Sequence, residues 1–187
     1  CYVQAAGEEL LKDEAVDIVV GNNRKQDLVS ILDQYFAEHQ GVENIIDIGK
    51  TGEYEPLHIR KISDHTRAFI KVQDGCNQFC SYCIIPYARG RVRSRKPEDV
   101  EAEVKGLVAR GYREVVLTGI HLSSYGTEHM EGSPVKGGDW DSGPLWDLIE
   151  RIHRVEGLER IRLGSLEPRI ITREFAEKLA GLPAFCP

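Results

Sequence analysis

Three short apolar segments, each followed by a helical pattern, constrain the fold more than any other feature of this sequence. The segments 67–75 (RAFIKVQDG), 114–122 (EVVLTGIHL) and 160–168 (RIRLGSLEP) are predicted strands. The second is a near-continuous apolar run, which is typical of parallel sheets. Helices are predicted for the stretches 96–112, 144–158 and 172–182. Strand and helix therefore alternate three times, which predicts right-handed β/α units of an α/β fold.

The preceding residues predict the end of another α/β domain. Residues 15–21 (AVDIVVG) form an apolar run closed by glycine, and residues 24–39 carry apolar positions at helical spacing. Residues 40–62 are interpreted as a linker or hairpin region, and a domain boundary is predicted near residues 55–65. The predicted domains are 1–57 and 58–187.

Composition and the ends of the chain limit the class of protein. The net charge is −6, so any site for a polyanion has to be a local patch. No apolar run approaches the length of a membrane span, and no signal peptide is recognisable, so we expect a cytoplasmic protein with reduced thiols. The sequence begins with Cys1 rather than Met and stops just after a predicted helix, so we expect a fragment of a longer protein.

The cysteines gather at the end of the first predicted β/α strand. Cys76, Cys80 and Cys83 follow the pattern Cys-x3-Cys-x2-Cys, and three thiolates on a tight loop suit iron–sulfur or zinc. A structural zinc site needs a fourth ligand, and the histidines available for it are His58, His65 and His121. Three ligands on a four-iron cube leave one iron open, which fits chelation of that iron by S-adenosylmethionine.

This pattern resembles the radical S-adenosylmethionine (radical SAM) superfamily, with Tyr82 at the aromatic position of Cys-x3-Cys-x-aromatic-Cys. The resemblance implies a TIM-type β/α barrel whose site lies on the loops after the strands. It also implies that the reduced [4Fe–4S] cluster splits the cofactor into methionine and a 5′-deoxyadenosyl radical. The protein then mainly positions and shields the cofactor.

The wider sequence narrows the resemblance. The words DGCNQFCSYCIIPYARGRVRSR, TGIHLSSYG and RLGSLEP are similar to the methylthiotransferase family, and CYVQAAGEEL resembles the end of that family's flavodoxin-like N-terminal domain. By this resemblance Cys1 is the last of three ligands of a second [4Fe–4S] cluster that carries the inserted sulfur. The other two ligands, the later barrel strands and an RNA-binding domain lie outside the sequence. The fragment alone is therefore expected to be inactive.

The stretch GIHLSSYG, and His121 within it, resembles the branch that modifies C2 of threonylcarbamoyladenosine beside the tRNA anticodon. The isopentenyladenosine branch and the branch that modifies a ribosomal protein remain alternatives. The partners implied are tRNA, an electron donor of flavodoxin or ferredoxin type and a sulfur source, with no membrane. The rival from another class is a non-enzymatic RNA-binding module stabilised by zinc.

Alternating basic residues follow the cysteines. In an extended conformation they would share one face, where they could contact tRNA phosphate or the cofactor carboxylate, or form a charged edge that discourages aggregation. The predicted RNA-binding residues are Arg89, Arg91, Arg93 and Arg95.

The predicted strand ends supply further candidates for binding the cofactor. Ser165 and Glu167 could bind its ribose or ammonium group and Arg162 its carboxylate, but helix capping before Pro168 is an equal reading for the first two. His121 could equally be a buried histidine with satisfied hydrogen bonds. The predicted cofactor-binding set is Tyr82, His121, Arg162, Ser165 and Glu167.

Overall fold

The computed structural model describes residues 1–57, 66–130 and 143–186, and the chain divides into two compact units. The first unit comprises Cys1–Leu57 and Gly75–Arg91, and the second comprises His58–Asp74 and Val92–Pro187. The segment Gly75–Arg91, which holds the three clustered cysteines, thus groups with the N-terminal residues. The division into domains 1–57 and 58–187 stays a prediction.

The first unit is built around two short parallel strands. Ile18 lies opposite Val42 in their register, so the hairpin interpretation of the region after residue 40 is wrong at this strand pair. The helices and strands of the unit are α1 (Tyr2–Leu10), β1 (Ile18–Val20), η1 (Lys25–Asp27), α2 (Leu28–Glu38), β2 (Val42–Asn44) and α3 (Ile85–Ala88). Asn22, just after β1, donates a side-chain hydrogen bond to the carbonyl of Ala88 in α3. The bond joins the two separate stretches of sequence that make up this unit.

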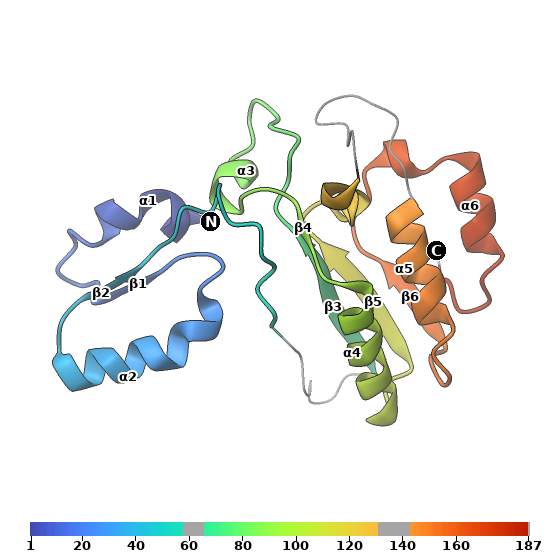
Figure 1. Ribbon diagram of the computed structural model, residues 1–187, viewed down its shortest axis with the longest axis horizontal. Coiled ribbons are helices and arrows are strands. Elements are labelled where there is room, and N and C mark those ends of the chain that lie inside the picture. Colours follow the sequence, from blue (N-terminus) through green and yellow to red (C-terminus); the bar gives the residue numbers. More distant parts are fainter. Residues whose placement is uncertain (58–65, 131–142, 187) are drawn as a thin grey trace. The chain divides into compact units, whose positions relative to one another are not determined.

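The second unit contains a four-stranded sheet in the order β4-β3-β5-β6 (Figure 1). Strands β3, β5 and β6 are parallel, and β4 runs antiparallel to β3. The elements are β3 (Arg67–Asp74), β4 (Arg93–Ser94), α4 (Pro97–Ala109), β5 (Glu114–Gly119), η2 (Leu122–Ser124), η3 (Thr127–His129), α5 (Gly143–His153), β6 (Arg160–Leu163), η4 (Pro168–Ile170) and α6 (Arg173–Ala180). Strand–helix alternation is present three times, so the predicted α/β class is confirmed.

Local sequence explains where these helices begin. Pro97 occupies the first turn of α4, where its missing N–H costs nothing, and Glu98 and Asp99 complement the positive end of the helix. The Thr172 side chain caps α6 by accepting a hydrogen bond from the N–H of Phe175.

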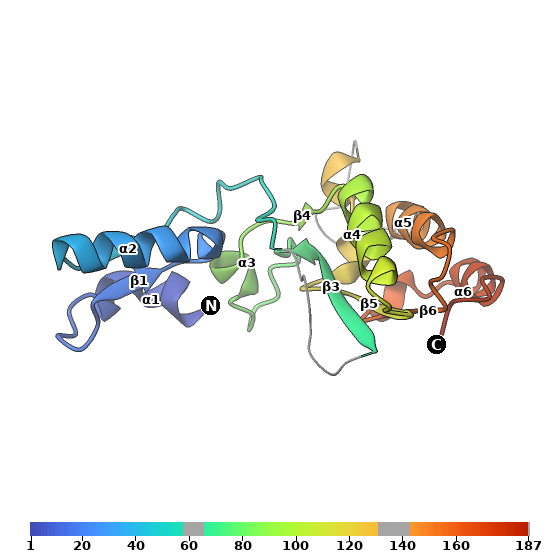
Figure 2. The ribbon, with the colours of Figure 1, turned by 90° about the horizontal axis from the view of Figure 1, so that it is seen from below.

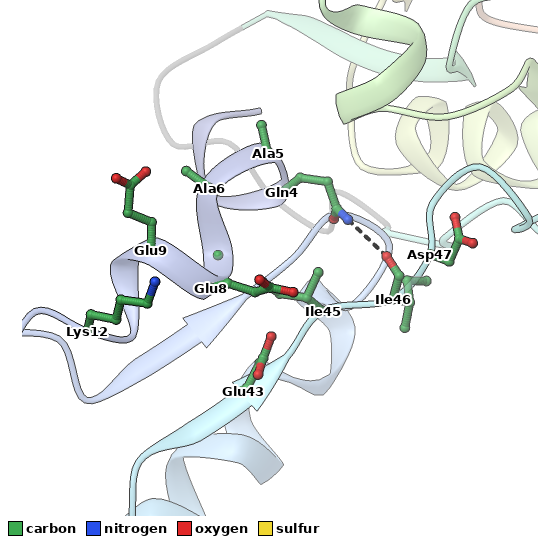
Figure 3. A pocket seen from close by; sticks show the side chains of 11 residues that line it. Gln4, Ala5, Ala6, Glu8, Glu9, Lys12, Glu43, Ile45, Ile46 and Asp47 are labelled. Carbon is green, nitrogen blue, oxygen red and sulfur yellow. Dashed lines mark hydrogen bonds between the residues drawn. The ribbon is translucent and has the colours of Figure 1, made fainter.

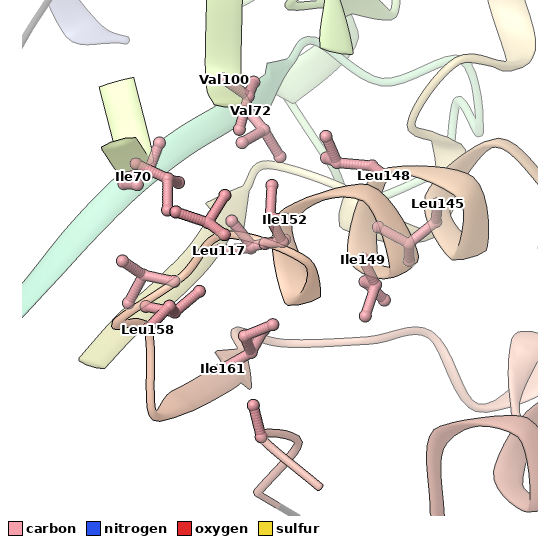
Figure 4. Close-up of a cluster of buried hydrophobic side chains, with 14 of the residues drawn as sticks. Ile70, Val72, Val100, Leu117, Leu145, Leu148, Ile149, Ile152, Leu158 and Ile161 are labelled. Carbon is pink, nitrogen blue, oxygen red and sulfur yellow. The ribbon is translucent and has the colours of Figure 1, made fainter. Parts of the chain in front are cut away.

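The core of the second unit lies between the sheet and its helices. Alternate residues of β3, namely Ala68, Ile70 and Val72, are buried on the helix side. Figure 2 shows α4 and α5 side by side over the sheet. Figure 4 shows side chains that fill the layer between the sheet and these helices. They are Ile70, Val72, Val100, Leu117, Leu145, Leu148, Ile149, Ile152, Leu158 and Ile161. Burial of these aliphatic groups supplies most of the favourable free energy of folding.

The opposite face of the sheet is less apolar. Phe69 of β3 is 49% exposed there, and the next residue of β3 on the same face is the charged Lys71. The helices described therefore cover one face, which is the arrangement of β/α barrels as well as of open sheets with a helix layer. Among the described residues, no helix is both long enough and apolar enough to cross a membrane.

The stretch that follows β5 is packed against the core. Ser123, Ser124 and Tyr125 are buried, and two turns of 3-10 helix pack this stretch against the core. The small hydroxyl side chains there are satisfied by internal hydrogen bonds. Residues 131–142 lie outside the described part of the chain.

Candidate functional site

The cysteine loop, Gly75–Arg91, follows directly after the carboxyl end of β3 and is closed at its base by backbone contacts. Gly75 has φ +73°, and a Cβ atom on it would lie 1.9 Å from the carbonyl oxygen of Arg91. The N–H of Cys76 donates to the carbonyl of Gly90 over 3.1 Å. Only glycine fits this close approach in a left-handed conformation, so Gly75 sets where the loop leaves the sheet.

The three thiols differ in exposure but share one short loop. Cys76 is buried, Cys83 is half-buried and Cys80 is exposed. A turn brings the N–H of Cys83 to 2.9 Å from the carbonyl oxygen of Cys80. Burial raises the pKa of the Cys76 thiol, the backbone N–H of Gln78 lowers it, and the charges of Cys83 and Cys80 raise it again. The thiols are thus near enough to interact electrostatically.

These donors fit an iron–sulfur cluster. Thiolates are the ligands of such clusters, and each thiolate of a four-iron cube binds a different iron, so the sulfurs need not meet at one point. Within residues 1–57, 66–130 and 143–186, no three His, Cys, Asp or Glu side chains converge as the ligands of one metal ion. His58 and His65, considered as fourth zinc ligands, lie outside the described residues.

Cys1 lies at the start of α1 in the first unit. It is exposed, and its carbonyl accepts a hydrogen bond from the N–H of Ala5 over 3.1 Å. Residues 2–57 contain no further cysteine, so a second cluster at Cys1 stays a prediction.

Gln73, at the end of β3, is a residue that the sequence reading missed. The register between β3 and β5 shifts between Lys71 and Gln73, and this irregularity sets Gln73 opposite Gly119. Its side chain is fully buried; Oε1 accepts from the N–H of His121 over 2.8 Å, and Nε2 donates to the carbonyl of Asp74 over 2.9 Å. The one available signal was a polar residue inside an otherwise buried strand just before the cysteines.

His121 lies in the turn after β5 and joins a hydrogen-bonded group. Its Nδ1 is 2.8 Å from the hydroxyl of Ser124. Burial lowers the pKa of His121; Glu167 opposes this effect, and Arg169 adds to it. The structure therefore favours the neutral imidazole. His121 is half-buried, so the alternative reading of a buried histidine with satisfied hydrogen bonds matches its hydrogen bonds but not its exposure.

The end of β6 approaches the same turn. The N–H of Glu167 donates to the hydroxyl of Ser123 over 2.9 Å, which links the loops after β5 and β6. The Glu167 carboxylate accepts two hydrogen bonds from Arg169, one from its backbone N–H over 3.1 Å and one from its guanidinium Nε over 2.7 Å. Glu167 thus caps the short helix η4, as its alternative reading expected, while Ser165 is exposed.

Arg162 does not belong to this group. It lies 2.9 Å from the carboxylate of Glu114, which begins β5 and also pairs with Arg67 and Arg160. Burial raises the pKa of Glu114, but hydrogen bonds from Arg160 and Arg162 and the charge of Arg67 outweigh it and leave the pKa lowered. Strand register gives the Arg162 guanidinium an acidic partner at the start of β5, and its contact with a cofactor carboxylate stays a prediction.

The alternating arginines do not form one extended face. Arg89 follows α3 in helical conformation, and only Arg93 and Ser94 of this stretch are in a strand. Arg93 is 1% exposed and lies 3.7 Å from the Asp74 carboxylate, while Arg95 is buried against Glu103 at 2.6 Å. Both guanidinium groups thus have acidic partners in this structure, and their contact with RNA stays a prediction.

Arg91 is exposed and its guanidinium carbon lies 4.5 Å from the centre of the Phe79 ring. Tyr82, the aromatic residue between the second and third cysteines, is 91% exposed. Arg89, Arg91 and Tyr82 are thus the residues of the loop that stay candidates for binding RNA or cofactor.

Comparison with known proteins agrees with this geometry. The family model described as "Radical SAM superfamily" matches residues 70–185. The threonylcarbamoyladenosine tRNA methylthiotransferase MtaB of Bacillus subtilis is 43% identical over 96% of this chain and 38% of its own length, and that of Aquifex aeolicus is 36% identical over 100% and 43%. The tRNA-2-methylthio-N(6)-dimethylallyladenosine synthase of Carboxydothermus hydrogenoformans is 36% identical over 91% and 36%. The chain thus spans about two fifths of the length of these curated relatives.

The matched range contains all three thiols of the cysteine loop and, apart from the start of β3, the three parallel strands with the turns that follow them. Because the match extends over more than half of the sequence and includes the residues best suited to hold a cluster, the chain belongs to the radical SAM superfamily.

Proposed function

We propose that the protein is a tRNA methylthiotransferase that inserts a methylthio group at C2 of threonylcarbamoyladenosine by radical SAM chemistry. The observation that carries the proposal is the grouping of Cys76, Cys80 and Cys83 on one loop directly after the first parallel strand. The two relatives named as threonylcarbamoyladenosine enzymes support the substrate.

Membership of the superfamily implies a [4Fe–4S] cluster and S-adenosylmethionine. Cys76, Cys80 and Cys83 would hold the cluster and leave one iron for the cofactor. The bound pair supplies reductive cleavage of the cofactor and, with it, hydrogen-atom abstraction. The burial of Cys76 would shield one side of the cluster from water, while the exposed Cys80 would face solvent or substrate.

The turns after the strands would bind the organic part of the cofactor. His121 is held by Gln73 and Ser124, and Glu167 by Ser123 and Arg169, so both side chains have restricted orientations. A neutral imidazole can donate or accept a hydrogen bond, and the Glu167 carboxylate accepts from ribose hydroxyls or an ammonium group. Ser165 and Tyr82 complete the proposed set.

The remaining parts of the proposal concern the longer protein. Residues 1–57 would be the end of a flavodoxin-like domain, in which Cys1 helps to hold a second [4Fe–4S] cluster, and residues 58–187 would begin a TIM-type barrel. The parallel order of β3, β5 and β6, with helices on one face, supports that barrel. The partners would be tRNA, an electron donor of flavodoxin or ferredoxin type and a sulfur source, in the cytoplasm.

Metal content is the first test. The chain is reconstituted anaerobically with iron and sulfide, reduced, and measured by electron paramagnetic resonance with and without S-adenosylmethionine. A four-iron signal that shifts on adding the cofactor is expected, and Cys80→Ala should abolish it. Cys186→Ala, which removes a thiol outside the loop, should leave it intact. Retention of zinc but not iron would overturn the proposal in favour of a zinc-stabilised RNA-binding module.

The substrate is tested in a hybrid in which this chain replaces the aligned region of the full-length Bacillus subtilis relative. Nucleoside analysis of tRNA from cells lacking that relative should show the methylthio group on threonylcarbamoyladenosine. Methylthiolation of isopentenyladenosine, or of a ribosomal protein alone, would reassign the chain to a sister branch, which the similarity to the Carboxydothermus protein makes the second candidate.

A further inference from the structure

An aromatic pair and an arginine form a compact group on the cysteine loop that the radical chemistry does not use. The rings of Phe79 and Tyr87 meet edge to face, with centroids 5.6 Å apart and planes at 84°. The guanidinium of Arg91 lies over the Phe79 ring, and Tyr87 is 68% exposed. We call Phe79, Tyr87 and Arg91 the aromatic platform.

The backbone holds this platform in a defined conformation. Phe79 has φ +49°, which is uncommon for a bulky residue and is often found where a side chain must be presented in one direction. Tyr87 lies in α3, where its N–H donates to the carbonyl of Ile84 over 3.0 Å. The hydrogen bond from Asn22 to the carbonyl of Ala88 fixes the end of α3.

The platform forms one wall of a cavity of about 270 Å³ within the first unit. Gln4 also lines this cavity and donates to the carbonyl of Ile46 over 2.9 Å, a bond drawn as a dashed line in Figure 3. Asp47 also lines the cavity, and its carboxylate is 3.0 Å from the ammonium of Lys50. The other lining residues are Ile48, Gly49 and Pro86.

Charge distinguishes this cavity from its larger neighbour. The cysteine loop has two arginines, three aromatic residues and no acidic residue, although the whole chain carries a net charge of −6. A second cavity, of about 680 Å³, is lined by Glu8, Glu9 and Glu43 (Figure 3). Those carboxylates disfavour phosphate, so of these two cavities the one beside the platform is the better suited to a polyanion.

We infer that the aromatic platform binds an unstacked base of single-stranded RNA, with the base stacked on the exposed Tyr87 ring, Phe79 supporting that ring edge to face, and Arg91 on a neighbouring phosphate. Exposed aromatic faces combined with a cation are the chemistry by which proteins bind single strands. The choice of RNA as occupant rests on the proposed function; the placement of base and phosphate rests on the contacts above.

The probe is a fluorescently labelled RNA hairpin with an adenosine-rich single-stranded loop, titrated against the iron-reconstituted chain by anisotropy. Tyr87→Ala should weaken binding about tenfold, while Tyr87→Phe should keep the affinity because it keeps the ring. Tyr87→Leu, apolar but without a ring, should behave as Tyr87→Ala. Arg91→Gln should lower the slope of log affinity against log salt by about 0.7, the contribution of one phosphate on a single strand.

Phe36→Ala is the matched control, because Phe36 is 65% exposed and lies on α2, outside the cavity. It should bind the hairpin as the unaltered chain does, and a fully paired duplex of the same sequence should be insensitive to Tyr87→Ala. Equal effects of Phe36→Ala and Tyr87→Ala, or no effect of Tyr87→Ala, would overturn the inference. The cofactor-dependent resonance signal is recorded on the same samples, so loss of the platform is distinguished from failure of the radical SAM proposal.

Discussion

The buried side chain of Gln73 joins the end of β3 to the backbone of His121 through a 2.8 Å hydrogen bond. The Nε2 atom of the same side chain donates a hydrogen bond to the carbonyl of Asp74, the last residue before the cysteine loop. One amide therefore connects the strand that precedes the thiols to the turn that holds the histidine. Gln73 thus fixes the backbone of His121 to the end of β3 within the second unit.

Replacing Gln73 by Leu should destabilise the second unit by about 1–3 kcal/mol, because the half-buried N–H of His121 loses its hydrogen bond to the buried Gln73 side chain. Urea unfolding followed by circular dichroism measures the change. Gln34→Leu on the exposed face of α2 should stay within about 0.5 kcal/mol. A Gln73→Leu variant as stable as the parent would show that the buried amide is dispensable.

Gly75→Ala should prevent iron binding by the cysteine loop. The added Cβ would collide with the Arg91 carbonyl, so the base of the loop has to open. Gly111→Ala is a matched control, because Gly111 has φ +96° but no atom within 4 Å of the new Cβ. The control should lose about 1–2 kcal/mol through backbone strain alone and load iron normally. Iron and sulfide analysis after reconstitution compares the two; equal iron content would contradict the prediction.

Stability should fall in mild acid because of His121. The pKa of this histidine is lowered from 6.5 in the folded chain, first by burial, with Glu167 opposing and Arg169 adding to the shift. The unfolded chain then binds more protons, so the free energy of unfolding decreases as the pH drops through 6.5 toward the lowered value. Above 6.5 no penalty exists. Urea midpoints measured from pH about 7.5 to about 5.5 should fall less in His121→Gln than in the parent, and identical slopes would refute the assignment.

Glu114→Gln should destabilise the sheet at the start of its strands. The change removes the carboxylate charge that Arg67, Arg160 and Arg162 share, although Arg160 keeps its pair with Glu159. Since these arginines are partly exposed, we expect a loss of about 1–2 kcal/mol rather than the larger cost of a fully buried pair.

Glu177→Gln provides the comparison for that loss, because Glu177 pairs with Arg173 on the exposed side of α6. Thermal unfolding of the two variants should separate clearly, with the control close to the parent. The prediction fails if the two variants unfold at the same temperature.

Sequence patterns located the strands and helices of the second unit well, because each has a strong local signal. Strand β3 was predicted at 67–75 and spans Arg67–Asp74, and the helix predicted at 96–112 is α4, Pro97–Ala109. The cysteine spacing likewise identified the loop that holds the thiols. These features depend on residues close together in the sequence.

Pairings across strands could not be predicted in the same way. Arg162 and Glu114 lie 48 positions apart, and their contact follows from the register of β5 with β6. Gln73 reaches His121 only because the β3–β5 register shifts at the strand end. The short helix α1 and strand β2 also lacked a clear signal, since few of their side chains are buried. Tertiary register, not local pattern, decides such contacts.

The order of strands in the sheet has a consequence for synthesis on the ribosome. Strand β5 joins β3, β6 joins β5, and Phe185 already bridges in parallel to Ile161 of β6. The two-residue strand β4 occupies the other side of β3. Each of these later strands therefore pairs with a strand that has already been synthesised, and the sheet grows along one edge. The nascent chain can build this sheet one unit at a time along that edge, while on the other side β4 protects only the Gln73–Asp74 end of β3.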